Sequence, residues 1–137
     1  MKKDILINMT IHDILKIEDR TEKVIAIHEL CSQHYQNWTE TERLLNAVID
    51  MEEDVMNGGF AQYFENKEKE EQKDAHIGLE KIGANKSKEL FEKAQVFYSN
   101  NDLDSIEDLD QEFFKYEDNI ANLVIAYTEK HVEDFSK

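Results

Sequence analysis

Three side chains that often bind metals or act as nucleophiles occur at three-residue intervals: His28, Cys31 and His34. On one helix these positions fan over roughly 120° of arc, so the side chains do not converge on one tetrahedral ion. No second Cys-x-x-Cys or His pair completes a zinc site. A nucleophilic Cys31 needs an activating base and an oxyanion loop, and only the base has a candidate, His28. We expect all three residues to pack against other helices.

Carboxylates are the other candidates for chemistry, beginning with Glu52, Glu53 and Asp54. Metal sites in helical bundles combine inward carboxylates with Glu-x-x-His motifs, and the sequence has no such motif in the required form. The acidic stretch 102–112 lacks the glycine and the ligand spacing of an EF-hand loop. His131 shares a helical stripe with apolar residues, which is typical of packing. The sequence therefore predicts no catalytic residue, no metal and no cofactor, and we expect a protein that is not an enzyme.

Negative charge is the strongest chemical signal in the sequence. The 137 residues carry a formal charge of −15. Two segments hold nearly all of the excess: 44–66, whose charged residues are all acidic, and 100–137, which has eleven acids and three lysines. Such a field repels nucleic acids and anionic membranes and attracts basic proteins. The alternative is that the acidity serves only solubility.

Rows of carboxylates could imitate a nucleic-acid strand. On a helix, side chains three or four positions apart have Cβ atoms roughly 5–6 Å apart, which is comparable to the phosphate spacing along DNA. The alternative is a solvated face, on which acids near a helix N-terminus favour the helix dipole. The predicted partner-binding surface consists of Asp50, Glu53, Asp54, Asp102, Asp104, Glu107, Asp108, Asp110, Glu112, Glu117 and Asp118.

Helices must carry these acids. Strands and their turns usually need proline and glycine, but the chain has no proline and only four glycines. Apolar residues recur at helical spacings through most of the chain. These features predict an all-α fold, an irregular bundle of seven or eight helices in a single acidic domain over residues 1–137. The expected helices cover approximately residues 5–17, 22–35, 40–57, 60–66, 74–82, 87–99, 105–114 and 119–135.

Short signals predict where several helices begin and end. Thr39 and Glu42 form a capping box, in which the threonine hydroxyl and the glutamate carboxylate satisfy free backbone amides. Asn57-Gly58-Gly59 predicts a helix end, because glycine and asparagine tolerate the left-handed conformation. Ser105, with Asp108 three residues later, predicts the start of another helix.

The sequence also suggests where the protein works. Cys31 is the only cysteine, which excludes an internal disulfide. We find no signal peptide, membrane-spanning segment or lipidation motif. We therefore expect a cytoplasmic protein.

One segment runs Asn57-Gly58-Gly59-Phe60 and continues with Gln62, Tyr63, Phe64 and Asn66. This segment resembles a bacterial family of domains of unknown function whose best-known member is a DNA mimic protein. Supporting matches are Ile82-Gly83-Ala84, Leu109-Asp110 before Phe113-Phe114, and Leu123 with Tyr127, so that the resemblance spans roughly residues 40–135. It implies an all-helical fold and a dimer whose carboxylates are arranged like DNA phosphates and occupy the DNA-binding surface of a transcriptional regulator.

The residue types of this segment predict a structural role. Gly58 and Gly59 permit a sharp turn between helices. The aromatic side chains are expected to fill the core, and the amides to cap helix ends. The residues expected to build the fold in these ways are Asn57, Gly58, Gly59, Phe60, Gln62, Tyr63, Phe64 and Asn66.

The leading functional hypothesis is an acidic interaction module of the DNA-mimic type. It would block a basic nucleic-acid-binding protein, either a DNA-binding regulator or a nuclease, and would itself bind neither nucleic acid nor membrane; a homodimer is one form it could take. One alternative is an immunity or antitoxin-type inhibitor of a basic toxin. Another is a small-ligand domain with a cleft near Asn57 and Gln62. The last is a structural domain whose acidity is only solubilising.

Overall fold

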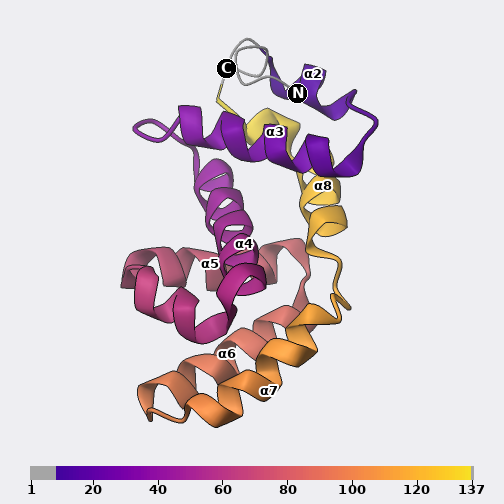
Figure 1. Ribbon diagram of the computed structural model, residues 1–137. Coiled ribbons are helices and arrows are strands. Elements are labelled where there is room, and N and C mark those ends of the chain that lie inside the picture. Colours follow the sequence, from indigo (N-terminus) through magenta and orange to yellow (C-terminus); the bar gives the residue numbers. More distant parts are fainter. Residues whose placement is uncertain (1–8, 137) are drawn as a thin grey trace. The chain divides into compact units, whose positions relative to one another are not determined.

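The computed structural model describes residues Met9–Ser136, which form helices joined by short loops (Figure 1). This part of the chain contains seven α-helices, one short 3-10 helix and no strand, which confirms the predicted all-α fold. The elements are α2 (Ile11–Leu15), α3 (Arg20–Gln33), α4 (Glu40–Asn66), α5 (Lys69–Ile82), α6 (Asn85–Ser99), α7 (Leu103–Phe114), α8 (Ile120–Lys130) and the 3-10 helix η1 (Val132–Asp134).

The chain forms two compact units. Unit 1 comprises Met1–Asn46 and Ala121–Lys137, and unit 2 comprises Ala47–Ile120. Unit 1 therefore contains α2, α3, the start of α4, nearly all of α8 and η1. Unit 2 contains the rest of α4 together with α5, α6 and α7. All the acids of the predicted surface belong to unit 2, whereas the assignment of residues 1–137 to a single domain stays a prediction.

Unit 1 begins, in its described part, with a short capped helix. Thr10 is extended, and its side chain accepts a hydrogen bond from the Asp13 backbone amide while the Asp13 carboxylate accepts from the Thr10 amide. This capping box starts α2 at Ile11, inside the helix expected over residues 5–17. Residues 5–8 of that expectation lie outside the described residues. Ile14 of α2 is completely buried within the unit.

The capping box predicted at Thr39 and Glu42 is confirmed. The Glu42 backbone amide donates to Thr39 Oγ1 over 3.2 Å, and the Thr39 amide donates to Glu42 Oε1 over 2.8 Å. The Glu42 side chain is 0% exposed. It also accepts from the His34 ring nitrogen Nδ1 and from the Ser136 hydroxyl at 2.8 Å. One buried carboxylate thus links the end of α3, the start of α4 and Ser136.

In unit 2, α4 continues through its expected end with a sharp kink. Only Gly59 leaves the helical conformation, with φ 85° and ψ 174°, and the helix resumes at Phe60. These angles are accessible almost exclusively to glycine. The predicted sharp turn between helices is therefore present, and it needs one glycine and not two.

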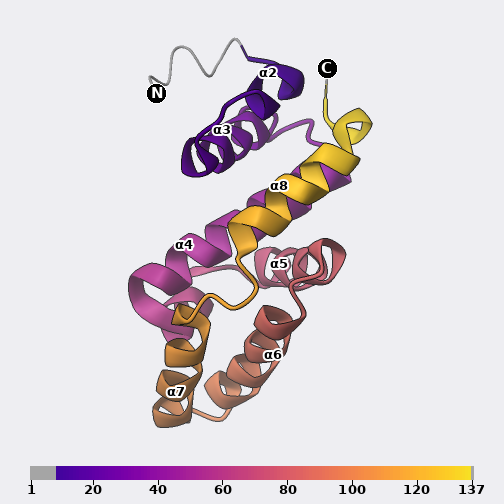
Figure 2. The same cartoon turned by 90° about the vertical axis from the view of Figure 1, so that its right-hand side faces the viewer.

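An aromatic cluster forms the centre of unit 2. The Phe60 ring packs edge-on against Phe113 of α7 with centroids 5.4 Å apart, and Phe64 packs against Phe91 of α6 at 5.3 Å. Helices α6 and α7 lie side by side, joined by a short loop (Figure 2). These contacts place α7 against both α6 and the end of α4.

Two expected helix ends differ from the structure. Helix α7 begins at Leu103, because Asp102 is its N-cap and accepts from the Ser105 amide over 3.2 Å. The predicted start at Ser105 is wrong: Ser105 already lies inside the first turn. Helix α8 ends at Lys130, where the chain passes into η1, so the last helix is shorter than expected.

Candidate partner-binding surface

Helix α7 is attached to the kink in α4 through one carboxylate. Asp110 Oδ1 accepts a hydrogen bond from the Phe60 backbone amide over 2.9 Å. This amide is one of the free donors at the start of the resumed helix, so Asp110 acts as a cap supplied by another helix. Burial raises the pKa of the Asp110 carboxyl and the charge of Glu107 raises it further, while the Phe60 amide lowers it. Asp110 therefore stabilises the packing of α7 against α4, in addition to any role that it has at a partner-binding surface.

A second contact joins the same two segments. The Tyr116 hydroxyl is 3.2 Å from both carboxylate oxygens of Glu52 and donates to that carboxylate. Burial raises the pKa of the Glu52 carboxyl, the Tyr116 hydrogen bond lowers it, and the Glu53 charge raises it. Sequence reasoning did not find this pair, because its partners are far apart in the chain and follow no local pattern.

Four more of the predicted surface acids have intramolecular hydrogen bonds. Asp54 accepts from the Gln62 side-chain amide over 2.8 Å, and Asp102 caps α7. Asp118 accepts from the Ser87 backbone amide over 2.5 Å and so caps the first turn of α6. Glu112 forms an ion pair with Lys115 over 2.8 Å, which lowers the pKa of its carboxyl. Much of the predicted surface is therefore also structural.

Five of the predicted acids remain exposed, and their side chains form no hydrogen bond or ion pair with any residue of the described part. They are Glu53, Asp104, Glu107, Asp108 and Glu117. Three of them lie on α7 at positions i, i+3 and i+4, which places their Cβ atoms roughly 5–6 Å apart. Unit 2 thus has a short row of unneutralised carboxylates on the exposed side of α7.

The α4 segment contributes an open hollow of about 290 Å³ next to the kink. It is lined by Asp50, Glu53, Asp54, Asn57 and Lys67. This hollow is the nearest feature to the cleft expected near Asn57 and Gln62. Lys67 brings a positive charge into it, which partly offsets the negative charge of the three acids.

The α5–α6 side of unit 2 has a different charge arrangement. Lys88 pairs with Glu80 over 3.0 Å, and Lys93 pairs with Glu89 over 2.9 Å. His76 contacts Glu92 over 2.8 Å. Glu80 and Glu89 are therefore neutralised by neighbouring lysines. The contrast follows the sequence, in which the stretch 67–99 is charge-balanced while 100–118 is not.

The residues of the Asn-Gly-Gly-Phe segment lie mainly inside unit 2. Phe60, Tyr63 and Phe64 are buried, and the Gln62 amide binds Asp54. Asn57 and Asn66 are exposed. Gly58 stays helical, and a Cβ added to it would meet the Gln62 side chain. Gly59 and the three aromatic residues thus shape the part of α4 against which α7 packs.

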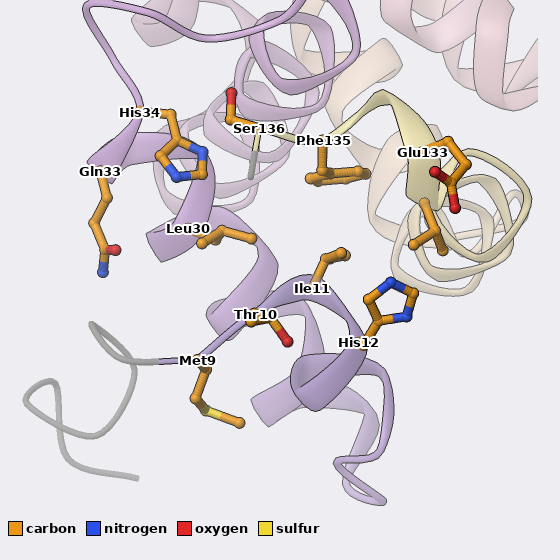
Figure 3. Close-up of a pocket in the computed structure, with 11 residues that line it drawn as sticks. Met9, Thr10, Ile11, His12, Leu30, Gln33, His34, Glu133, Phe135 and Ser136 are labelled. Carbon is orange, nitrogen blue, oxygen red and sulfur yellow. The ribbon is translucent and has the colours of Figure 1, made fainter.

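Unit 1 contains an apolar pocket of about 370 Å³ (Figure 3). Ile11, Leu30 and Phe135 form its apolar wall, and His34 and Ser136 stand together at one end, where both bind the buried Glu42. These residues were not among the predicted sites, since they are brought together by tertiary contacts. The pocket is chemically distinct from the acidic surface of unit 2.

Cys31, considered above as a nucleophile, is completely buried in unit 1. Burial raises the pKa of its thiol, and the Glu42 charge raises it further. The reactive thiolate is therefore scarce at neutral pH. His34, the third member of the His-Cys-His series, is engaged with Glu42, and His28 is half-buried.

No helix within Met9–Ser136 combines the length and the apolar character that crossing a bilayer requires. No curated protein matches the sequence, and no solved structure does. The model of the DMP19-like protein family matches residues 36–131, a range that includes α4 to α7, the Asn-Gly-Gly-Phe segment and every acid of the predicted surface. This match confirms the resemblance noted in the sequence, and membership of this family suggests a DNA mimic. The chain belongs to the DMP19-like protein family.

Proposed function

We propose that this protein is a non-enzymatic DNA mimic that occupies the basic surface of a DNA-binding regulator or nuclease in the cytoplasm. The observation that supports this most directly is the row of Asp104, Glu107 and Asp108 on α7, exposed and without cations bound to it in the described part of the chain. Their helical spacing is close to that of DNA phosphates. Glu53, before the kink in α4, and Glu117, after α7, extend the negative charge.

The attraction should be long-range and sensitive to salt. Exposed charges are screened within about 8–10 Å at ordinary ionic strength, so complementary charge mainly accelerates encounter and selects basic partners. A protein that binds duplex DNA already has cations spaced for phosphates. Carboxylates at a comparable spacing can engage the same cations and exclude DNA. Inhibition would then follow from direct competition.

A capture and competition experiment tests this proposal. The protein is immobilised, proteins retained from native lysate are identified, and each one is purified and bound to its own DNA duplex. We expect the added protein to displace the DNA at low salt. The triple variant Asp104→Asn, Glu107→Gln, Asp108→Asn should bind at least about tenfold more weakly, because neutralised rim charges reduce association.

The matched control removes three acids elsewhere in unit 2. Glu68→Gln, Glu70→Gln and Glu71→Gln change the net charge equally at exposed positions around the start of α5. We expect this variant to displace DNA nearly as well as the unmodified protein. Equal weakening in both triple variants would show that only net charge matters and would contradict the mimic. If the retained partner is a nuclease and its cleavage of DNA is blocked, the protein is an immunity-type inhibitor.

The family resemblance further implies a dimer. We propose that the mimic acts as a homodimer, and sedimentation of the purified chain over a range of concentrations measures this directly. A single monomeric species at every concentration would refute this part of the proposal while leaving the competition experiment unaffected.

A small-ligand function is the second candidate, favoured by the apolar pocket of unit 1. Its volume of about 370 Å³ lies within the usual range for ligand sites. We expect ligand-observed NMR with small amphipathic compounds to give binders. The variant Met9→Trp, which places an indole at the pocket wall, should abolish their signals. Binding that persists in this variant would place the ligands elsewhere.

A further inference from the structure

Exposed apolar side chains accompany the acids on the α4 and α7 segments. In unit 2, the large hydrophobic residues that remain exposed are Met56, Val96, Leu103 and Phe114. Three of these four lie on α4 or α7, and Val96 lies on α6. Exposed apolar side chains are common on any surface, so their position decides whether they matter.

Two hydrogen bonds define a seam between α4 and α7. Asp110 binds the Phe60 amide at one end of the seam, and Tyr116 binds Glu52 at the other. Phe114 follows Asp110 by four residues and therefore lies one turn along the same face of α7. Met56 follows Glu52 by four residues, in the same way, on α4. Both apolar side chains thus lie along one seam, between the two contacts that close it.

Two exposed carboxylates accompany this pair on the same helices. On α7, helical geometry places Leu103, Glu107 and Phe114 within about 40° of arc, so Glu107 shares the exposed row with Phe114. Glu53 is exposed on α4, three residues before Met56. An apolar centre with a charged rim is the usual anatomy of a protein–protein interface, and aromatic side chains often supply its binding energy.

We propose that Met56 and Phe114 form an apolar anchor within the acidic surface, and that the partner is a basic protein with an apolar patch among its lysines and arginines. Met56 is 45% exposed and Phe114 is 38% exposed, so each still has surface to bury. The inference rests on the proposed function and adds to it: the partner is selected by apolar contact as well as by charge, which a polyelectrolyte mimic alone would not achieve.

Charge decides between a partner and a second copy of the chain. A two-fold contact across this seam would place Glu53 and Glu107 near their own copies, and juxtaposed like charges disfavour association. A basic partner neutralises the same carboxylates. The anchor therefore fits a basic protein, and a homodimer would use a different face.

Two peptides of equal charge separate the apolar contribution from the electrostatic one. One peptide alternates lysine with glycine and serine, and the other has the same lysines with leucine in place of the small residues. Fluorescence anisotropy measures the binding of each at low and high salt. We expect the leucine peptide to bind at least about fivefold more tightly, as an anchor contact would allow, and to keep part of its affinity at high salt.

Single variants locate the effect on the surface. Met56→Ser and Phe114→Ser should each abolish most of the preference for the leucine peptide, while Phe114→Leu should retain it. Val96→Ser on α6 is the matched control, since Val96 is 59% exposed, and should leave the preference intact. Circular dichroism melts of each variant confirm that unit 2 remains folded.

The outcomes distinguish this inference from the proposed function. Equal affinity for the two peptides, or a preference that survives both serine variants, overturns the anchor. If the charge-neutralised α7 triple variant binds both peptides as well as the unmodified protein, the acidic surface itself is contradicted. A shift of Phe114→Ser and Met56→Ser to a smaller species in sedimentation would assign the seam to a second copy and overturn the basic partner.

Discussion

Replacement of Gly59 by alanine is expected to destabilise unit 2 by about 3 kcal/mol, which combines backbone strain with the loss of one buried hydrogen bond. Gly59 has φ 85° and ψ 174°, and a Cβ built there would lie 2.4 Å from Asp110 Oδ2. The Asp110 carboxylate cannot move away without releasing the Phe60 amide. Urea denaturation followed by circular dichroism measures the loss.

The matched control is Gly83→Ala, at the C-terminal end of α5. Gly83 also has positive φ, 83°, but nothing lies within 4 Å of a Cβ added there. Only backbone strain is expected, about 1–2 kcal/mol for a non-glycine residue in the left-handed region. Equal costs at both positions would contradict a close approach between Asp110 and the kink. The Gly59→Ala protein should also show weaker peptide binding, because the seam between α4 and α7 opens.

Replacement of Glu42 by glutamine is expected to destabilise unit 1 by about 3 kcal/mol at neutral pH, as breaking a buried charged network does. Burial raises the pKa of the Glu42 carboxyl, but hydrogen bonds from Thr39, His34 and Ser136 outweigh it and leave the pKa lowered from 4.5. A carboxyl with a lowered pKa stabilises the fold above its ordinary titration range. This contribution is lost as the pH falls through the lowered value.

The pH dependence gives this prediction a second readout. The difference in unfolding free energy between the unmodified protein and the Glu42→Gln variant should be largest at neutral pH. It should become smaller below pH 4.5, the ordinary pKa of a glutamate, because Glu42 is then protonated in the unfolded chain. The fluorescence of Trp38, the only tryptophan, reports the unfolding of unit 1. Glu40→Gln, an exposed acid two residues earlier, is the control and should change little. A difference that stays constant with pH would show that the Glu42 charge is not what stabilises the unit.

Local patterns predicted those features of the fold that depend on neighbouring residues. The absence of proline and the helical spacing of apolar residues indicated an all-α chain, and the Thr39 capping box is formed by atoms three residues apart. The start of α7 was placed wrongly because Asp102 and Ser105 are both good N-cap residues, and local sequence does not rank them. In the structure Asp102 also accepts the Ser105 hydroxyl over 2.7 Å, which favours the earlier start.

The predicted surface also has features that depend on neighbouring residues and features that depend on the packing of distant helices. Charge counting identified the acidic segments, but it could not separate acids that bind other parts of the protein from acids that face solvent. Asp110 and Phe60 are fifty positions apart, and Asp118 and Ser87 are thirty-one apart. Such pairs form only when helices pack, because a side chain reaches a free backbone amide of another element only through the tertiary arrangement.

The sequence by itself determined the helical character of this protein, the excess of carboxylates in two segments and its resemblance to a family, because composition, spacing and short motifs act over a few residues. Only the tertiary structure decided which carboxylates hold α7 against the kinked helix and which remain exposed beside Met56 and Phe114. The physical reason is that buried amides must find acceptors, and the packing of distant helices selects which acids satisfy them.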